Sequence, residues 1–111
     1  SQVLAKIGSW EWDIVHDKWY FSEQWKKIHG VSADDLHTTK LIQIAHPEDA
    51  PYILKAITDA KEQKKTYDIE HRIIRADNKE IRYIKALGEV EYDQDGGVRM
   101  VGTAQDITEF K

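Results

Sequence analysis

Two kinds of hydrophobic spacing divide the chain into strand-like and helix-like parts. Trp10, Trp12 and Ile14 alternate with polar residues, which is the period of a strand that buries one face. A second short strand is predicted over residues 18–21, so that the two form a hairpin. Three later segments are also strand-like, with β-branched and aromatic residues between turn residues: 66–75, 80–92 and 98–108.

The part between these strands predicts helices. Ser22 is a suitable N-cap for a short helix that Gly30 ends. Further short turns are predicted at 32–35, which has the form of a capping box, and from Thr39. A longer helix is predicted over about 51–63, because apolar residues recur there at helical spacing. Its apolar stripe holds Ile53, Ile57 and Ala60.

The order of these elements predicts an α+β fold with one antiparallel sheet and helices packed on one face. A length of 111 residues is close to the commonest domain size, so we expect a single domain over 1–111. Val3, Leu4 and Ile7 fall at near-helical spacing, and residues 1–7 are therefore predicted to be the end of an N-terminal flanking helix. Both ends of the chain are expected to continue into a longer protein.

Composition narrows the function classes. The formal net charge of −4 is mixed along the chain, and without a basic stripe we expect no nucleic-acid partner. No segment approaches the ~20 apolar residues of a membrane helix and no signal peptide is visible, so we expect no membrane insertion. The chain has no cysteine, which removes disulfides, thiolate metal sites, cysteine nucleophiles and cysteine-dependent flavin photochemistry. A reducing cytosol fits this composition, and we expect a cytoplasmic protein.

The turn residues predict how the last three strands pair. With turns centred on 77–78 and 95–96, the numbers of paired residues sum to about 155 in the first hairpin and about 191 in the second. Glu70 then lies opposite Lys85, and Lys85 lies opposite Asp106, which makes an acid–base–acid row across three strands. A slip of one residue would destroy this row.

The same register sorts the side chains onto two faces. The face toward the helices is predicted to hold Trp10, Trp12, Ile14, Tyr67, Ile69, Ile73, Ile84, Ala86, Val101 and Ile107. The opposite face carries charges together with six apolar residues: Ile74, Ile81, Tyr83, Leu87, Val98 and Met100. A sheet that faced only water would not need these six. We expect either the flanking helix, with Val3, Leu4 and Ile7, or a second molecule to cover them.

At these positions the chain resembles a PAS domain, specifically the third PAS fold class of sensory-box type. The resemblance rests on four phrases in the same order: GSWEWDI (8–14), HPED (46–49), YDIEHRIIRADNKEIRYI (67–84) and DQDGGVRMVGTAQDIT (93–108). The longer helix between the second and third phrases matches as well. The resemblance implies a five-stranded antiparallel sheet in the order 2-1-5-4-3, with the helices on one face.

The resemblance also implies a function. Such a domain is a sensory, signal-transmitting module of a larger signalling protein, such as a two-component histidine kinase or a cyclic-di-GMP enzyme. It would relay a ligand-dependent or dimer-packing change to a covalently linked effector through a helix after 106–108, so that residues 109–111 begin the linker. The family's Asp often pairs with a basic residue, for which the predicted register nominates Lys85, with Arg82 as runner-up. The expected transmission residues are Glu70, Arg82, Lys85, Asp106 and Thr108.

The candidate ligand-binding residues are side chains that are predicted to point inward: Trp10, Trp12, Trp25, Ile57, Tyr67, His71 and Gln105. Core packing is the competing interpretation of the tryptophans, and an ordinary buried histidine that of His71. Haem-binding relatives usually take an axial histidine from the longer helix, and the absence of histidine from 51–63 argues against haem. Non-covalent flavin or another small molecule stays open, although the lining favours an empty or nearly filled core over an obligatory cofactor.

Three other interpretations of the sequence compete with this one. His46, Glu48 and Asp49 resemble a metal site, but acidic residues beside Pro47 suit the start of a helix, so no metal is expected. The outer apolar face favours a homodimer, and a ligand-free dimerisation or protein-interaction module is the main alternative function. A small cone-shaped α+β enzyme of the isomerase type would need an inward acid–base pair, and the predicted inner face offers only His71, Gln105 and Tyr67. We therefore expect a regulator rather than an enzyme, with no catalytic residues.

Overall fold

The structure is a computed structural model that describes residues 6–32, 37–63 and 65–111. The predicted flanking-helix residues Val3 and Leu4, and most of the predicted turn at 32–35, lie outside the described residues.

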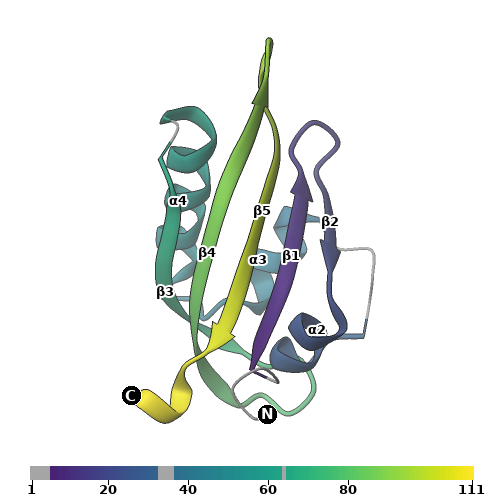
Figure 1. The fold of residues 1–111 in the computed structure, drawn as a ribbon. Coiled ribbons are helices and arrows are strands. Elements are labelled where there is room, and N and C mark those ends of the chain that lie inside the picture. Colours follow the sequence, from purple (N-terminus) through teal and green to yellow (C-terminus); the bar gives the residue numbers. More distant parts are fainter. Residues whose placement is uncertain (1–5, 33–36, 64) are drawn as a thin grey trace.

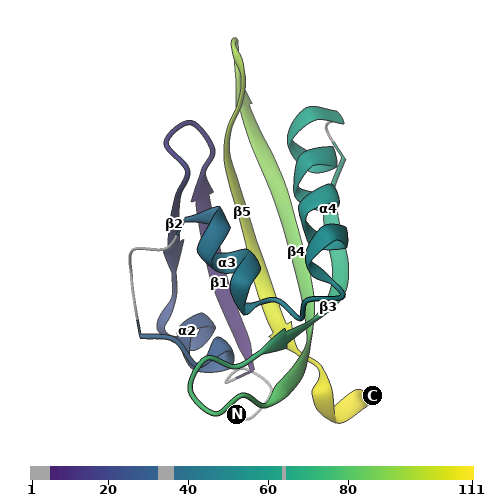
Figure 2. The ribbon, with the colours of Figure 1, turned by 180° about the vertical axis from the view of Figure 1, so that it is seen from behind.

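One antiparallel sheet and three helices make up the described part of the chain. The strands are β1 (Ile7–Asp13), β2 (Lys18–Phe21), β3 (Tyr67–Ile74), β4 (Ile81–Asp93) and β5 (Gly96–Asp106). The helices are α2 (Glu23–His29), α3 (Thr38–Ile44) and α4 (Ala50–Gln63), and a short 3-10 turn, η1 (Thr108–Phe110), follows β5. The sheet order β2-β1-β5-β4-β3 confirms the predicted α+β class and strand order (Figure 1). All three helices lie on the same face of the sheet (Figure 2).

The helix boundaries follow from local chemistry close to where the sequence predicts them. The Ser22 hydroxyl accepts a hydrogen bond from the backbone N–H of Trp25, and Gly30 ends α2 in the left-handed region with φ 69°. Helix α3 begins at Thr38, one residue before the prediction. The stripe of α4 is buried as predicted, at Ile53, Ile57 and Ala60.

The prediction that residues 1–7 end a flanking helix is wrong at Ile7. This residue does not end a helix but begins β1, where it pairs with Gln105 on β5. The backbone carbonyl of Lys6 continues this pairing by accepting a hydrogen bond from the N–H of Asp106. The strand ladder therefore satisfies the backbone groups that the predicted helix would have used.

The first hairpin has the predicted register. Glu70 lies opposite Lys85, and the pairing continues to Ile74 opposite Ile81. The turn itself is wider than the predicted two-residue centre, because the N–H of Lys79 bonds to the carbonyl of Arg75 and Lys79 takes the left-handed conformation with φ 64°.

The second hairpin does not have the predicted register. At its tip Asp93 pairs with Gly96, so the turn lies one residue earlier than predicted, and a β-bulge beside Glu91 then shifts the pairing by one residue. Lys85 consequently lies opposite Gln105, while Asp106 lies opposite Ile84. The predicted acid–base–acid row is therefore wrong at its third member.

This shift of one residue exchanges the two faces of β5. Met100, with 0% of its surface exposed, and Ala104 point into the core, although Met100 was predicted on the outer face. Val101 pairs with Glu11 and Glu89 on the outer face, so its predicted place inside is also wrong. Asp106 lies on the buried face and is only 6% exposed.

Trp10 lies across the middle of the sheet. A Cβ atom on Gly88 would come within 2.6 Å of the indole Cη2 of Trp10, and one on Gly102 would collide with the same ring. These two glycines lie directly opposite each other on β4 and β5. Beyond them the indole meets the ring of Tyr67 edge-on, at 5.8 Å between centroids. One side chain of β1 thus packs over β5 and β4 as far as β3.

We predict that Gly88→Ala destabilises the chain by about 2 kcal/mol, because the added methyl group overpacks the core against Trp10. Urea denaturation measures the change. The matched control is Gly97→Ala on β5, where the nearest atom to a Cβ is a side-chain methyl of Val90 at 3.0 Å. Equal urea midpoints for the two variants would contradict the close contact between Gly88 and the ring of Trp10.

Candidate functional site

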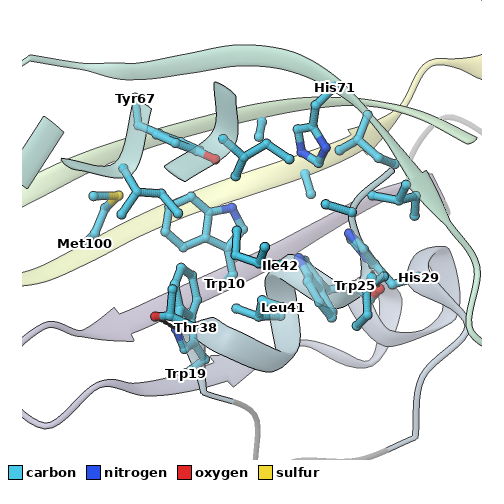
Figure 3. Close-up of a pocket in the computed structure, with 18 residues that line it drawn as sticks. Trp10, Trp19, Trp25, His29, Thr38, Leu41, Ile42, Tyr67, His71 and Met100 are labelled. Atoms are coloured by element: carbon cyan, nitrogen blue, oxygen red, sulfur yellow. Dashed lines mark hydrogen bonds between the residues drawn. The ribbon is translucent and has the colours of Figure 1, made fainter. Parts of the chain in front are cut away.

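A cavity of about 80 Å³ lies between the sheet and the three helices (Figure 3). Every strand and every helix contributes to its lining. The residues around it are Trp10, Trp19, Trp25, His29, Thr38, Leu41, Ile42, Ile44, Ala45, Ile53, Ile57, Tyr67, His71, Ile73, Ile84, Ala86, Met100 and Ala104. They include five of the seven predicted ligand-binding residues: Trp10, Trp25, Ile57, Tyr67 and His71.

The other two predicted residues lie elsewhere. Trp12 is buried, but its ring stacks on Trp19 at 5.1 Å and does not line the cavity. Gln105 lies on the outer face of the sheet, beside Ile7 and Lys85, because of the register of β5.

Several lining residues were missed in the sequence. Met100 and Ala104 were missed because the predicted register of β5 was wrong by one residue. His29 was missed although a signal was present, since it follows Trp25 by four residues on α2 and therefore shares its face. His71 is consequently not the only inward-facing histidine.

The two histidines of the cavity are held in the neutral form. Burial lowers the pKa of His29 to about 3, although its Nδ1–H donates a hydrogen bond of 2.8 Å to the Trp25 carbonyl. Burial also lowers the pKa of His71. Burial raises the pKa of the Tyr67 hydroxyl, so this group stays protonated. At neutral pH these three groups therefore bring no charge to the cavity.

Helix α3 forms one wall of the cavity and is tied to the β1–β2 hairpin through Asp17. The Asp17 carboxylate accepts hydrogen bonds from the indole N–H of Trp12, at 2.8 Å, and from the hydroxyl of Thr38. The Thr38 hydroxyl in turn accepts one from the indole N–H of Trp19, at 3.1 Å. Asp17 takes the left-handed conformation, with φ 49°. Because His37 offers no side-chain cap, Asp17 acts as the cap of α3 from another part of the chain.

A second polar cluster lies at the end of β5. Asp106 accepts hydrogen bonds from the hydroxyl and the N–H of Thr108 with one carboxylate oxygen, and from Arg82 with the other, at 2.9 Å. The Thr108 hydroxyl accepts a further bond from the N–H of Tyr83. Burial opposes the ionisation of Asp106, but the bonds from Thr108 and Arg82 outweigh it and hold the pKa of this carboxyl below its usual range. Arg82, the predicted runner-up, is thus the partner of Asp106, and Lys85 is not.

The acidic residues of HPED serve the structure. The Arg72 guanidinium donates two hydrogen bonds to the Asp49 carboxylate and a third to Glu48, and the backbone N–H of Arg72 also donates to Asp49. Bonds from Arg72 lower the pKa of Asp49 to about 2. His46 accepts a bond from the N–H of Glu48. Among residues 6–32, 37–63 and 65–111 no three histidine or carboxylate side chains converge as a metal site would require.

The size and chemistry of the cavity limit what it can hold. Pockets for drug-sized ligands usually measure about 300–1,000 Å³, several times the roughly 80 Å³ found here. Flavin and haem therefore do not fit the cavity in this structure. No Asp or Glu lines it among the described residues, so it offers no carboxylate base for proton transfer.

We predict that the stability of the chain falls as the pH decreases from about 7 to about 5, through protonation of buried histidine in the unfolded state. His29 has a pKa of 6.5 when exposed and about 3 when folded, so within this window the unfolded chain binds the extra proton. Each such histidine contributes a slope of up to about 1.4 kcal/mol per pH unit. His29→Phe keeps an aromatic ring against Trp25 and should remove one such slope, as urea denaturation at several pH values would measure.

The matched control is Val15→Ala, on the exposed turn between β1 and β2, which removes no titratable group and should leave the slope unchanged. The carboxylates of Asp49 and Asp106 lose their stabilising charge only below this window, because their pKa values are lowered in the folded chain. Equal slopes for the wild type and His29→Phe would contradict a buried neutral His29.

Comparisons with known proteins identify the family. A family model described as the PAS fold matches residues 18–104. Hybrid signal transduction histidine kinase I of Dictyostelium discoideum is 27% identical over 96% of this chain, which spans 6% of that protein's length. A solved sensory box histidine kinase/response regulator of Burkholderia thailandensis is 28% identical and superimposes with a TM-score of 0.82, over 96% of this chain and 80% of that one.

A further solved structure shares the fold at low identity. It is the N-terminal domain of a diguanylate cyclase with a PAS/PAC sensor from Marinobacter aquaeolei, 16% identical, with a TM-score of 0.85 over 95% of this chain and 98% of that one. The chain belongs to the PAS-fold family, as its sequence predicted. Within the described residues, every helix is too short or too polar to cross a lipid bilayer.

Proposed function

We propose that this chain is a sensory, signal-transmitting PAS module of a larger signalling protein. A histidine kinase or a cyclic-di-GMP enzyme is the proposed effector, since the relatives named above include histidine kinases and a diguanylate cyclase. The domain senses or transmits and the linked effector carries out the chemistry, in the cytoplasm. The cavity receives the signal, and the segment after β5 passes it on.

One observation carries this proposal: a part-buried ion pair between Arg82 and the buried Asp106 fastens the end of β5. Asp106 is 6% exposed and joins Arg82 on β4 to Thr108. The backbone N–H of Ile107 also donates to the carbonyl of Tyr83, so the chain after β5 stays attached to β4. Because β4 lines the cavity through Ile84 and Ala86, a shift of β4 would move this attachment. An attachment with two arrangements is what a transmitter requires.

Charged residues on the outer face of the sheet also contact the segment after β5. Lys111 lies 2.8 Å from the Glu70 carboxylate and 5.9 Å from the centre of the Tyr83 ring. Lys85 also contacts Glu70, at 4.0 Å, and Asp68 at 3.2 Å. Glu70 and Lys85 thus hold secondary places in the proposed path. Exposed pairs of this kind contribute little, ~0–1 kcal/mol each, whereas the buried Asp106 contact contributes more.

We predict that Asp106→Asn weakens or abolishes the signal-dependent change in effector output while the domain stays folded. The amide keeps the size of the carboxyl group but removes the charge that Arg82 binds, at a cost of about 2 kcal/mol of stability. The measurement is effector activity of the natural full-length protein with and without signal, together with thermal unfolding of the domain. Arg99→Gln, which removes only exposed outer-face contacts with Glu11 and Glu91 and lies outside the proposed path, is the matched control.

The output of Arg82→Gln should match that of Asp106→Asn, because both remove the same ion pair. If both variants keep the full signal-dependent change in output, the proposed path through Asp106 is wrong.

A ligand-free dimerisation module is the second candidate, and the outer face of the sheet favours it. Ile81 is 47% exposed and Leu87 is 41% exposed, and both belong to the predicted apolar outer set. Ile74 and Tyr83 are half-buried beside them. A homodimer that covered this face would bury apolar surface that a lone domain leaves in water. The two proposed functions are compatible if dimer packing is itself the transmitted signal.

Sedimentation equilibrium tests the dimer. We predict a concentration-dependent homodimer whose dissociation constant rises at least about ten-fold in Leu87→Glu, since burying a leucine contributes ~1.5–3 kcal/mol. Val15→Glu is the control, because Val15 is an equally apolar but exposed residue on the hairpin between β1 and β2. A wild-type monomer at all concentrations, or equal effects of the two variants, would exclude the outer face as the interface.

A further inference from the structure

Trp10 and the size of the cavity point to a particular class of ligand, an inference that rests on the proposed sensory function. The indole of Trp10 spreads over β5 and β4 on the inner face of the sheet, above Gly88 and Gly102. A flat molecule that entered between the sheet and the helices would need this same surface. The remaining cavity measures about 80 Å³, about half the ~150 Å³ of an engineered cavity that takes up benzene.

Glycine at these two positions gives the indole its place. Any larger residue at Gly88 or Gly102 would put a Cβ atom into the ring of Trp10. The ring of Tyr67 packs edge-on against the far edge of the Trp10 ring, at an interplanar angle of 85°. Trp19 lies against another side, with centroids 5.6 Å apart. The ring of Trp10 is therefore held in position and limits the space from the sheet side.

The polar atoms around the cavity suit a ligand with hydrogen-bonding groups. No hydrogen bond within the described residues engages the Tyr67 hydroxyl or the indole N–H of Trp10 and Trp25. No polar side-chain atom in that part of the chain is sealed off without a partner, so these three groups border open space. Figure 3 shows the Tyr67 hydroxyl pointing between the surrounding side chains.

The lining also selects against charge. Within the described residues no Lys, Arg, Asp or Glu contributes to it. His29 is buried and His71 half-buried, and desolvation lowers the pKa of both, so a carboxylate or phosphate ligand would lose its hydration without gaining a cationic partner.

We propose that the cavity takes an uncharged molecule of only a few heavy atoms that hydrogen-bonds to Tyr67 and the indole N–H groups, and that Trp10 is the residue that sets this size limit. Trp10 occupies the place that the flat ring of a larger ligand would fill. Removing its side chain should therefore let the cavity accept a larger ligand without moving the surrounding helices.

Binding of ring compounds to the 111-residue chain tests both parts, with calorimetry and thermal shift as readouts. Wild type should bind pyrrole and exclude indole. Trp10→Ala should bind indole, because the ligand replaces the missing side chain, and its melting temperature should rise with indole concentration. Indole-2-carboxylate should bind this variant at least about ten-fold more weakly than indole, since its charge would be desolvated without a partner.

Trp12→Ala is the matched control, since Trp12 is equally buried but lies outside the cavity lining. It should not gain indole binding. Should Trp10→Ala fail to fold, Trp10→Leu should take up benzene, which wild type excludes.

Three results would overturn the inference: no binding of pyrrole by wild type, indole binding by wild type or Trp12→Ala as tight as by Trp10→Ala, and carboxylate binding as tight as that of indole. Effector output is measured separately. If the cavity binds these compounds as predicted but the output of the full-length protein does not respond to them, the proposed function is wrong and the proposed ligand class still holds.

Discussion

The contact of one indole with two glycines holds the arrangement of this domain together. Trp10 reaches from β1 across Gly102 and Gly88 to the edge of Tyr67, so a single side chain of β1 packs against the next three strands of the sheet. The observed pairing of β4 and β5 puts both glycines beneath the ring. The small volume of the cavity follows from this packing, since the indole fills the surface that faces the helices.

Around this apolar centre the charges are distributed to the edges. Asp106 with Arg82, Asp49 with Arg72, and Asp17 at the start of α3 each fasten a different element of the fold to the sheet. In the cavity itself burial keeps histidine and tyrosine neutral. A domain built in this way has an uncharged interior and ionic contacts where its parts meet. Those contacts are the places where a change in the interior can be converted into a movement outside.

Much of the fold could be predicted, and the failures have a common cause. Caps such as Ser22 and Gly30 act within a few residues, so local sequence identifies them. The face of β5 could not be identified, because Val98, Met100 and Val101 place apolar residues at both positions of the two-residue period. A bulge beside Glu91 and a turn one residue earlier decided it. Met100, Gln105 and the partner of Asp106 were all misplaced through that single shift.

Local spacing and phrases in a fixed order were enough to predict the class of the fold, the order of its strands, the caps of α2, the buried stripe of α4 and the family. Only the tertiary structure decided which side chains share the cavity. His29, Trp19 and Met100 come together there from three different elements. It also decided that Arg82 rather than Lys85 meets Asp106, since a one-residue change in pairing turns every side chain of a strand to the other face.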